Sequence, residues 1–434
     1  MTENAKVRTE RELPVRKTFF NLSVFQFLTF LRRGVFYTFM IDYLYALMKT
    51  VTSTATLGTL NMVASSIGQN FLWGKICDKY KIRAKLIVIG ETIAASAYMI
   101  VFLVHRSLIS SGNNFAAGLS IIIGLSVLEF FWSMSDVGWA ALLTDITTPS
   151  TRGRVIGAMN FIASLGRMAG ILYSGFLYSD GEGFRSGTIF YIVTILLLAG
   201  AALMAFTSRR IKAGCTAPQQ KIMSQTKTDG DELSKKSEKT YWWFLASLII
   251  IVLGAASVNQ IFLLFVKLPQ GLNFTDTEKT LVLSAWTIGG MITSLAAGRL
   301  SDRFGRSKVF LSGLILAAVT PLLYSYASAV PLMALVYGLN GVSFWTIQTV
   351  GFVLAGDLIP HAKRGRLFSR YNAVMALSWG PAGVLIGGPL ADLQVQRLGM
   401  PSYSAYVNAF YLSSILVFIG TVLFAIKIGR IRSE

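Results

Sequence analysis

Seven charged side chains lie within apolar segments of the first half of the sequence, and each segment is long enough to cross a membrane. A charge at the centre of a bilayer costs about 2.5–3.5 kcal/mol unless it is paired or hydrated, and such residues commonly serve ion or substrate pathways. The second half has no comparable interior charge, because Asp357 and Asp392 fall at segment ends. The seven residues are Arg32, Arg33, Asp42, Glu91, Glu129, Asp136 and Arg167.

Helical spacing selects among these charges, because residues three, four or seven apart share one face of a helix. On the first segment Arg33 and Tyr37 share a polar stripe, whereas Arg32 lies about 100° away beside phenylalanines. We therefore favour Arg33 as the residue that faces a cavity. We expect Arg33, Glu129 and Arg167, each near the middle of its helix, to meet at similar depth. The polar faces are Gln26, Thr29, Arg33 and Tyr37; Ser126, Glu129, Ser133 and Asp136; and Asn160, Ser164, Arg167 and Ser174.

The charged group predicts proton coupling, with Glu129 or Asp136 as the residue that binds the proton. A poorly hydrated carboxylate holds a proton more readily, which suits binding and release near neutral pH. The alternative is a static ion-pair network that holds the helices together. Asp42, near the outer end of its segment, is interpreted as a solvated residue.

Uncharged hydrogen-bonding and aromatic side chains occupy the corresponding segments of the second half. Such groups suit a polar organic or amphiphilic substrate. For each residue taken singly, a hydrogen bond between neighbouring helices is an equally good explanation. These residues are Asn259, Gln260, Asn340, Trp345, Gln348 and Trp379.

Composition identifies the chain as a membrane protein. Of 434 residues, 53% are hydrophobic and 14% charged, against roughly 45–50% and about 25% in soluble domains. Twelve apolar segments reach the roughly 20 residues that a membrane helix needs, and their continuous hydrophobicity excludes a membrane β-barrel. They lie near 19–47, 53–76, 84–105, 115–144, 155–178, 187–207, 241–267, 279–300, 309–328, 331–357, 367–391 and 405–427.

We therefore expect an all-α membrane protein with six-helix bundles at 1–207 and 241–434, joined by a polar cytoplasmic linker at 208–240. Of the 40 lysines and arginines, 31 fall in the tails, linker and loops on one side. This asymmetry places both termini in the cytoplasm. Because the basic residues sit in short loops, nucleic acid is not an expected partner. Two cysteines and two histidines suggest neither a disulfide framework nor a metal site.

Two motif pairs recur in the same order in both halves. GKICDKYKIRAK from Gly74 matches GRLSDRFGRSK from Gly298, 224 residues later. DITTPSTRGR from Asp145 matches DLIPHAKRGR from Asp357, 212 residues later. Such recurrence indicates a duplicated six-helix unit. The arginines of the second pair are Arg152 and Arg154 in the first copy, and Arg364 and Arg366 in the second.

With these motifs, nearly the whole chain resembles the major facilitator superfamily. The signature that follows the second helix of that family is complete in the second copy, at Gly298, Asp302, Arg303, Gly305, Arg306 and Lys308. The first copy keeps Gly74, Asp78 and Lys79 but has Lys81 and Ile82 where the family has glycine and arginine.

The resemblance implies alternating access around a site at the membrane midplane. The first, fourth, seventh and tenth helices would line this site, and the motif loops would form a cytoplasmic gate with Asp78 and Asp302 as matching carboxylates. The alternative is that the motif charges only set topology. Glu91 is interpreted as structural, because the third helix is peripheral in the family.

Glycines on the fifth segment resemble the antiporter motif of drug–proton exchangers in the same superfamily. Ile171 and Ser174 depart from that motif. Close packing of a GxxxG face explains Gly166 and Gly170 equally well.

The sequence thus predicts a secondary transporter of a small organic solute, driven by a proton gradient and requiring no cofactor or metal. An enzyme is not expected. Efflux of drugs or amphiphiles and transport of sugars or organic anions are both open, and a receptor, scaffold or lipid-handling protein is the alternative class. We expect a monomer in the plasma or inner membrane.

Overall fold

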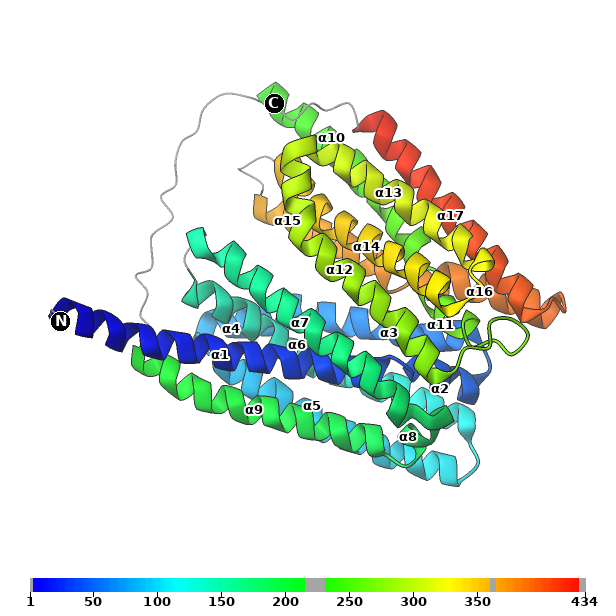
Figure 1. Ribbon diagram of the computed structural model, residues 1–434, viewed down its shortest axis with the longest axis horizontal. Coiled ribbons are helices and arrows are strands. Elements are labelled where there is room, and N and C mark those ends of the chain that lie inside the picture. The colour runs from blue at the N-terminus through cyan, green and yellow to red at the C-terminus, as the bar shows by residue number, and fades with distance from the viewer. Residues whose placement is uncertain (1–2, 148, 215–230, 360–363, 429–434) are drawn as a thin grey trace. The chain divides into compact units, whose positions relative to one another are not determined.

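The computed structural model describes residues 3–147, 149–214, 231–359 and 364–428. Side chains are described for residues 18–77, 79–143, 145–147, 155–209, 239–293, 296–359 and 370–428. Within these ranges all regular structure is helical and none is strand (Figure 1). The predicted all-α class is therefore confirmed.

By its internal contacts the chain forms two compact units. The first contains residues 1–38 and 64–223, and the second contains residues 39–63 and 224–434. Residues 39–63 thus pack with the second unit, although they lie near the start of the sequence. The predicted bundles at 1–207 and 241–434, with a linker at 208–240, remain a prediction.

Long helices build the first unit. The π-helical stretch Gly68–Trp73 and the single turn Ser179–Gly181 interrupt them. The helices are α1 (Glu3–Tyr37), α4 (Gly74–Tyr80), α5 (Arg83–Ser110), α6 (Asn114–Ile146), α7 (Pro149–Tyr178), α8 (Glu182–Arg185) and α9 (Thr188–Gly214).

In sequence order the second unit begins with α2 and with α3 up to residue 63. The remaining residues of α3 belong to the first unit. A 3-10 turn at Tyr324–Tyr326 and π-helical stretches at Gly383–Gly387 and Leu393–Arg397 connect some of its helices. The helices are α2 (Met40–Met48), α3 (Val51–Ile67), α10 (Asp231–Ala256), α11 (Asn259–Phe265), α12 (Asp276–Phe304), α13 (Arg306–Leu323), α14 (Val330–Leu358), α15 (Arg364–Trp379), α16 (Gly388–Asp392) and α17 (Ser402–Lys427).

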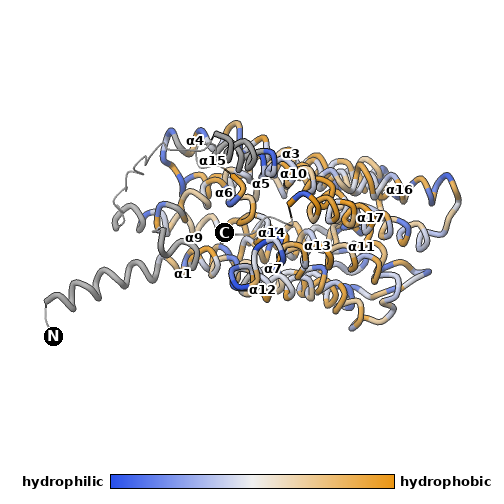
Figure 2. Tube along the Cα trace, turned by 90° about the horizontal axis from the view of Figure 1, so that it is seen from above, coloured by the Kyte–Doolittle hydropathy of each residue, from blue (hydrophilic) through white to orange (hydrophobic). Residues whose placement is uncertain are grey.

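Ten of the twelve predicted spans coincide with helices that are long and apolar enough to cross a membrane. In the described residues nine single helices meet this criterion, and α12, which bends by 49°, would be the tenth. Figure 2 shows hydrophobic residues along these helices and hydrophilic residues mainly towards their ends. The spans predicted at 19–47 and 53–76 are not among the helices that meet it in the described residues.

The first and seventh predicted spans are broken at corresponding places. The chain leaves helical geometry between Tyr37 and Met40, and again between Ala256 and Asn259. At the first break the Thr38 hydroxyl donates to the Gly34 carbonyl oxygen at 2.5 Å. Transporters with internal repeats often form their sites at discontinuous helices of this kind. The first break also coincides with the boundary between the two units.

Glycines allow α1 and α7 to approach closely. A Cβ added to Gly34 would lie 2.5 Å from the carbonyl oxygen of Arg167 and 2.8 Å from the Cα of Gly170. A Cβ on Gly166 would meet the backbone of Phe27. These contacts support the close-packing explanation of the GxxxG face.

Candidate functional site

Four charged residues of the first unit lie where α1, α5 and α6 meet, namely Arg32, Arg33, Glu91 and Asp136. Arg33 on α1 and Asp136 on α6 form an ion pair, with 3.8 Å between Nη2 and Oδ2. Their side chains are 33% and 42% exposed. At 3.8 Å the contact is longer than a strong hydrogen bond. The pair is therefore loosely held, and both side chains are partly accessible.

Trp132 connects this pair to a buried group that contains Arg32 and Glu91. The guanidinium carbon of Arg33 lies 4.3 Å from the centre of the indole ring, and that of Arg32 lies 4.8 Å from it. The indole Nε1 donates a hydrogen bond of 2.8 Å to Glu91 Oε1. Ser135 Oγ donates to the same carboxylate oxygen at 2.8 Å. Glu91 therefore fixes the ring on which both arginines rest.

The buried group is sealed from solvent. Arg32 is 2% exposed and Glu91 is 1% exposed. Arg32 Nη1 donates to the Tyr98 hydroxyl at 3.0 Å, and Tyr98 is also buried. The polar stripe that singled out Arg33 thus separated an accessible arginine from a buried one. Trp132 and Tyr98 were missed, although Trp132 lies three residues after Glu129 and four before Asp136, on one helical face.

Glu129 and Arg167 occupy different surroundings. Glu129 is half-buried on α6 and interacts electrostatically with Arg33 and Asp136. Arg167 lies exposed on α7, and Tyr37 is half-buried at the end of α1. The structure brings Arg33 to Asp136, and the expected meeting of Arg33, Glu129 and Arg167 stays a prediction.

Asp42 is not solvated, so that expectation was wrong. Its carboxylate forms an ion pair with the Lys279 ammonium on α12, and Lys279 is fully buried while Asp42 is 8% exposed. The Phe39 ring lies 5.1 Å from the Lys279 Nζ. Because 237 positions separate the two partners, local sequence spacing could not reveal the pair.

The two motif loops each hold an ion pair. In the second copy Arg306 contacts the Asp357 carboxylate. In the first copy Arg83 Nε lies 2.8 Å from Asp145 Oδ2. Ile82 occupies the position of the family's arginine, and the arginine one residue later forms the equivalent contact.

Two further basic residues of the motifs lie beside aromatic rings. Lys79 lies over the Tyr80 ring and Arg303 over the Phe304 ring. Asp302 is exposed. Space is open beside Gly298, whereas a Cβ on Gly74 would lie 2.9 Å from the Gln69 carbonyl oxygen. The side chains of Asp78, Arg152, Arg154, Arg364 and Arg366 lie outside the described residues.

The turn of the first motif keeps left-handed geometry without glycine. Lys81 has φ of 51°, and Gly305 has φ of 93° in the second copy. A residue with a Cβ is strained by about 1–2 kcal/mol in this region.

We expect Lys81→Gly to raise the free energy of unfolding by about 0.5–1 kcal/mol, since the relief of strain exceeds the added entropy of the unfolded chain. SDS-induced unfolding in mixed micelles measures the change. Lys79→Gly is the matched control, because Lys79 is helical and its replacement should destabilise by about 1 kcal/mol. Equal effects of the two substitutions would contradict the strain argument.

The uncharged residues of the second unit divide into packing and pocket residues. Asn340 Nδ2 donates to Thr320 Oγ1 at 3.2 Å and so joins α14 to α13. Trp345 packs against Gly290. Asn259 is half-buried at the start of α11, and the buried Gln260 Oε1 has no hydrogen-bond partner in the described part of the chain. Gln348 and Trp379 line a pocket.

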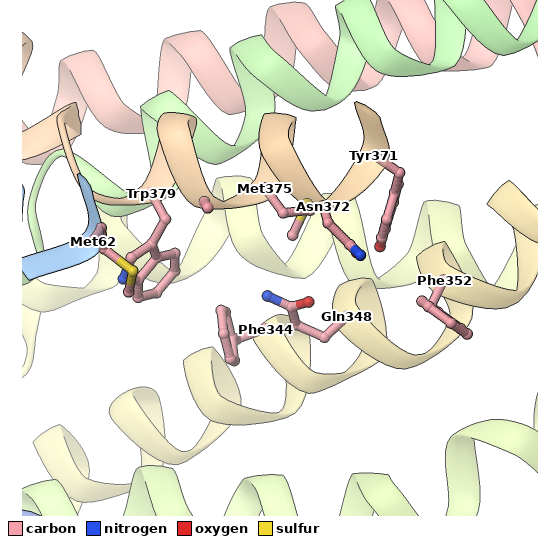
Figure 3. Close-up of a pocket in the computed structure, with 9 residues that line it drawn as sticks. Met62, Phe344, Gln348, Phe352, Tyr371, Asn372, Met375 and Trp379 are labelled. Atoms are coloured by element: carbon pink, nitrogen blue, oxygen red, sulfur yellow. The ribbon is translucent and has the colours of Figure 1, made fainter. Parts of the chain in front are cut away.

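This pocket has a volume of about 350 Å³ and lies between α14, α15 and α3 (Figure 3). Its size falls in the range of small-molecule sites. Besides Gln348 and Trp379, sequence reasoning did not identify its walls. The lining is Met62, Phe344, Gln348, Phe352, Tyr371, Asn372, Met375, Ala376 and Trp379.

Comparison with known proteins gives matches over most of the chain. A family model described as Major Facilitator Superfamily matches residues 22–275 and 246–434. The multi-drug resistance efflux pump PmrA homolog of Lactococcus lactis is 22% identical over 342 residues, which cover 77% of this chain and 78% of that protein. The puromycin resistance protein pur8 of Streptomyces alboniger is 29% identical over 175 residues, or 39% of this chain. The chain spans only 17% to 33% of the length of that protein and two other curated relatives.

Solved structures share the fold. A bacterial homolog of the human lysosomal transporter Spinster superimposes with a TM-score of 0.67 and 11% identity. The superposition covers 95% of this chain and 96% of that one.

Proposed function

The chain belongs to the major facilitator superfamily, and on that premise we propose that it is a proton-coupled transporter of drug-like or amphiphilic organic molecules. Family membership makes it a multi-pass membrane transporter of the cell membrane and not an enzyme. The relative named a multi-drug resistance efflux pump, matched over most of both chains, favours efflux over sugar or organic-anion transport. Both termini would face the cytoplasm, as the distribution of basic residues indicates.

The Arg33–Asp136 pair carries the proposal of proton coupling. It is partly exposed and 3.8 Å long, so protonation of Asp136 can release Arg33 at small cost. The neighbouring Arg32 and Glu91 are sealed and hydrogen-bonded, as suits a static network. The static-network explanation therefore fits Arg32 and Glu91, and the proton-coupling explanation fits Arg33 and Asp136. Glu129 is half-buried beside the exposed pair and is the second candidate for proton binding.

We expect Asp136→Asn to abolish proton-driven accumulation of puromycin in proteoliposomes, down to the level without a pH gradient. Substrate exchange without a gradient should continue, because binding does not require the proton. Glu129→Gln tests the second candidate in the same assay.

Glu182→Gln is the control, since Glu182 is exposed on α8 and outside the charged group. Unchanged gradient-driven accumulation in both Asp136→Asn and Glu129→Gln would contradict the assignment of proton coupling to these carboxylates.

A further inference from the structure

We propose that the pocket of the second unit binds an uncharged, planar aromatic part of the substrate, held between two pairs of aromatic rings. This inference rests on the proposed function and names the class of molecule that the pocket accepts. It depends on the arrangement of side chains from two facing helices, α14 and α15.

Each helix contributes side chains at intervals of about four residues. Phe344, Gln348 and Phe352 follow one another on α14, and Tyr371, Met375 and Trp379 do so on α15. Residues four apart lie on one face of a helix, so each helix presents a continuous row to the pocket. Residues eight positions apart lie about 12 Å apart along a helix axis, which is the length of three or four fused aromatic rings.

The ends of the pocket are aromatic. At one end the rings of Phe344 and Trp379 lie 4.9 Å apart and are inclined by 54°. At the other end the rings of Phe352 and Tyr371 lie 6.1 Å apart at 71°. Inclined pairs of this kind offer both ring faces and ring edges to a flat ligand. Figure 3 shows the two pairs at opposite ends of the row.

Two amides lie between the aromatic ends. Gln348 from α14 and Asn372 from α15 point toward one another across the pocket (Figure 3). Among the described residues neither amide makes a hydrogen bond to another side chain or to the backbone. Each offers two donors and an acceptor, so together they fit a flat ligand that carries a carbonyl oxygen on one edge and an N–H group on the opposite edge.

The residues that line the pocket offer a ligand no charged partner. None of its nine residues is an arginine, lysine, aspartate, glutamate or histidine. A charged group placed there would lose hydration without gaining a counter-charge. Met62 and Met375 contribute flexible thioether side chains that adapt to irregular shapes. The pocket therefore selects for flatness and neutrality more than for one molecular outline.

Three flat tricyclic probes of similar size test the inference. Acridone is neutral and carries a carbonyl and an N–H group, proflavine is a cation, and anthracene-9-carboxylate is an anion. Their equilibrium binding is measured by fluorescence titration of the purified full chain in nanodiscs, without any pH gradient. We expect acridone to bind at least tenfold more tightly than either charged probe. Tighter binding of proflavine or of the carboxylate would overturn the inference.

Substitutions of residues that line the pocket test whether acridone binds there. We expect Trp379→Ala to weaken acridone binding about tenfold or more, since stacking contacts and apolar burial are both lost. Gln348→Ala with Asn372→Ala should weaken it about fivefold to tenfold through lost neutral hydrogen bonds. Trp243→Ala is the matched control, because Trp243 is 39% exposed on α10 and lies outside the pocket. Acridone affinity that is unchanged in Trp379→Ala would overturn the assignment.

A second variant separates a loss of acridone binding from a loss of folding. If Trp379→Ala unfolds more readily than the native chain, Trp379→Leu leaves a larger apolar side chain in place without an aromatic ring and provides the affinity comparison instead. Because binding is measured at equilibrium, unchanged accumulation in both Asp136→Asn and Glu129→Gln would refute only the proton proposal. Absent acridone binding by a chain that still accumulates puromycin would refute only the pocket proposal.

Discussion

Lys279→Met is expected to lower the free energy of unfolding by about 3–5 kcal/mol, because it leaves the Asp42 carboxylate buried without its counter-charge. Lys279 is fully buried, Asp42 is 8% exposed, and the Phe39 ring covers the ammonium group. SDS-induced unfolding in mixed micelles measures the effect. The double variant Asp42→Leu with Lys279→Met should recover most of the loss, since apolar replacement of a buried pair is often neutral.

Lys239→Met provides the control for Lys279→Met. Lys239 is exposed at the membrane-proximal part of α10, and its replacement should change stability by less than about 0.5 kcal/mol. If Lys279→Met were as stable as this control, the ion pair would not hold residues 39–63 to the second unit.

The second large effect is expected at Glu91. Glu91→Leu should destabilise the first unit by about 3–5 kcal/mol, because the Trp132 Nε1 and Ser135 Oγ donors lose their shared acceptor and Arg32 loses a nearby negative charge. Thermal unfolding of the purified protein, followed by tryptophan fluorescence, measures the loss. The change should also free the indole that supports Arg33, which lies 4.3 Å away.

Glu91→Gln separates hydrogen bonding from charge. Its amide oxygen can accept from both Trp132 and Ser135, so we expect it to recover part of the stability lost in Glu91→Leu. A Glu91→Leu protein with native stability would show that the buried group is not a structural network. Equal losses in both variants would assign the whole effect to the charge.

Continuous apolar segments and the duplicated motifs were enough to predict the helical class and the family. Both signals are local or repeated, and hydrophobic length alone marks a helix that can cross a membrane. The breaks after Tyr37 and Ala256 were missed, because neither contains proline and both lie within apolar sequence. The backbone conformation at Lys81 was also difficult to predict, since tertiary context imposes a left-handed conformation that lysine does not favour.

The sequence offered candidate site residues where one helix carried the whole signal. The polar stripe favoured Arg33 over Arg32, and of these two residues of α1 Arg33 is partly exposed whereas Arg32 is buried. Residues that depend on a second helix escaped prediction. Trp132 gains its role from Glu91 on α5, and Asp42 gains its role from Lys279. The rows on α14 and α15 were visible as four-residue spacings, but only their face-to-face arrangement makes a pocket.

Residues 39–63 also bear on the order in which the protein is made. Asp42 meets Lys279 and the Val51 amide meets Asp392, across 237 and 341 positions respectively. Synthesis adds about 5–20 residues per second, so Asp42 waits on the order of 10–50 seconds for its partner to emerge. During that time the Asp42 carboxylate lacks its ion-pair partner, and the Val51 and Thr52 amides lack the Asp392 carboxylate that accepts their hydrogen bonds. The duplicated halves of the sequence are therefore not independent units of assembly, and a ribosome that stops after the first half leaves α2 and α3 without the surface that completes them.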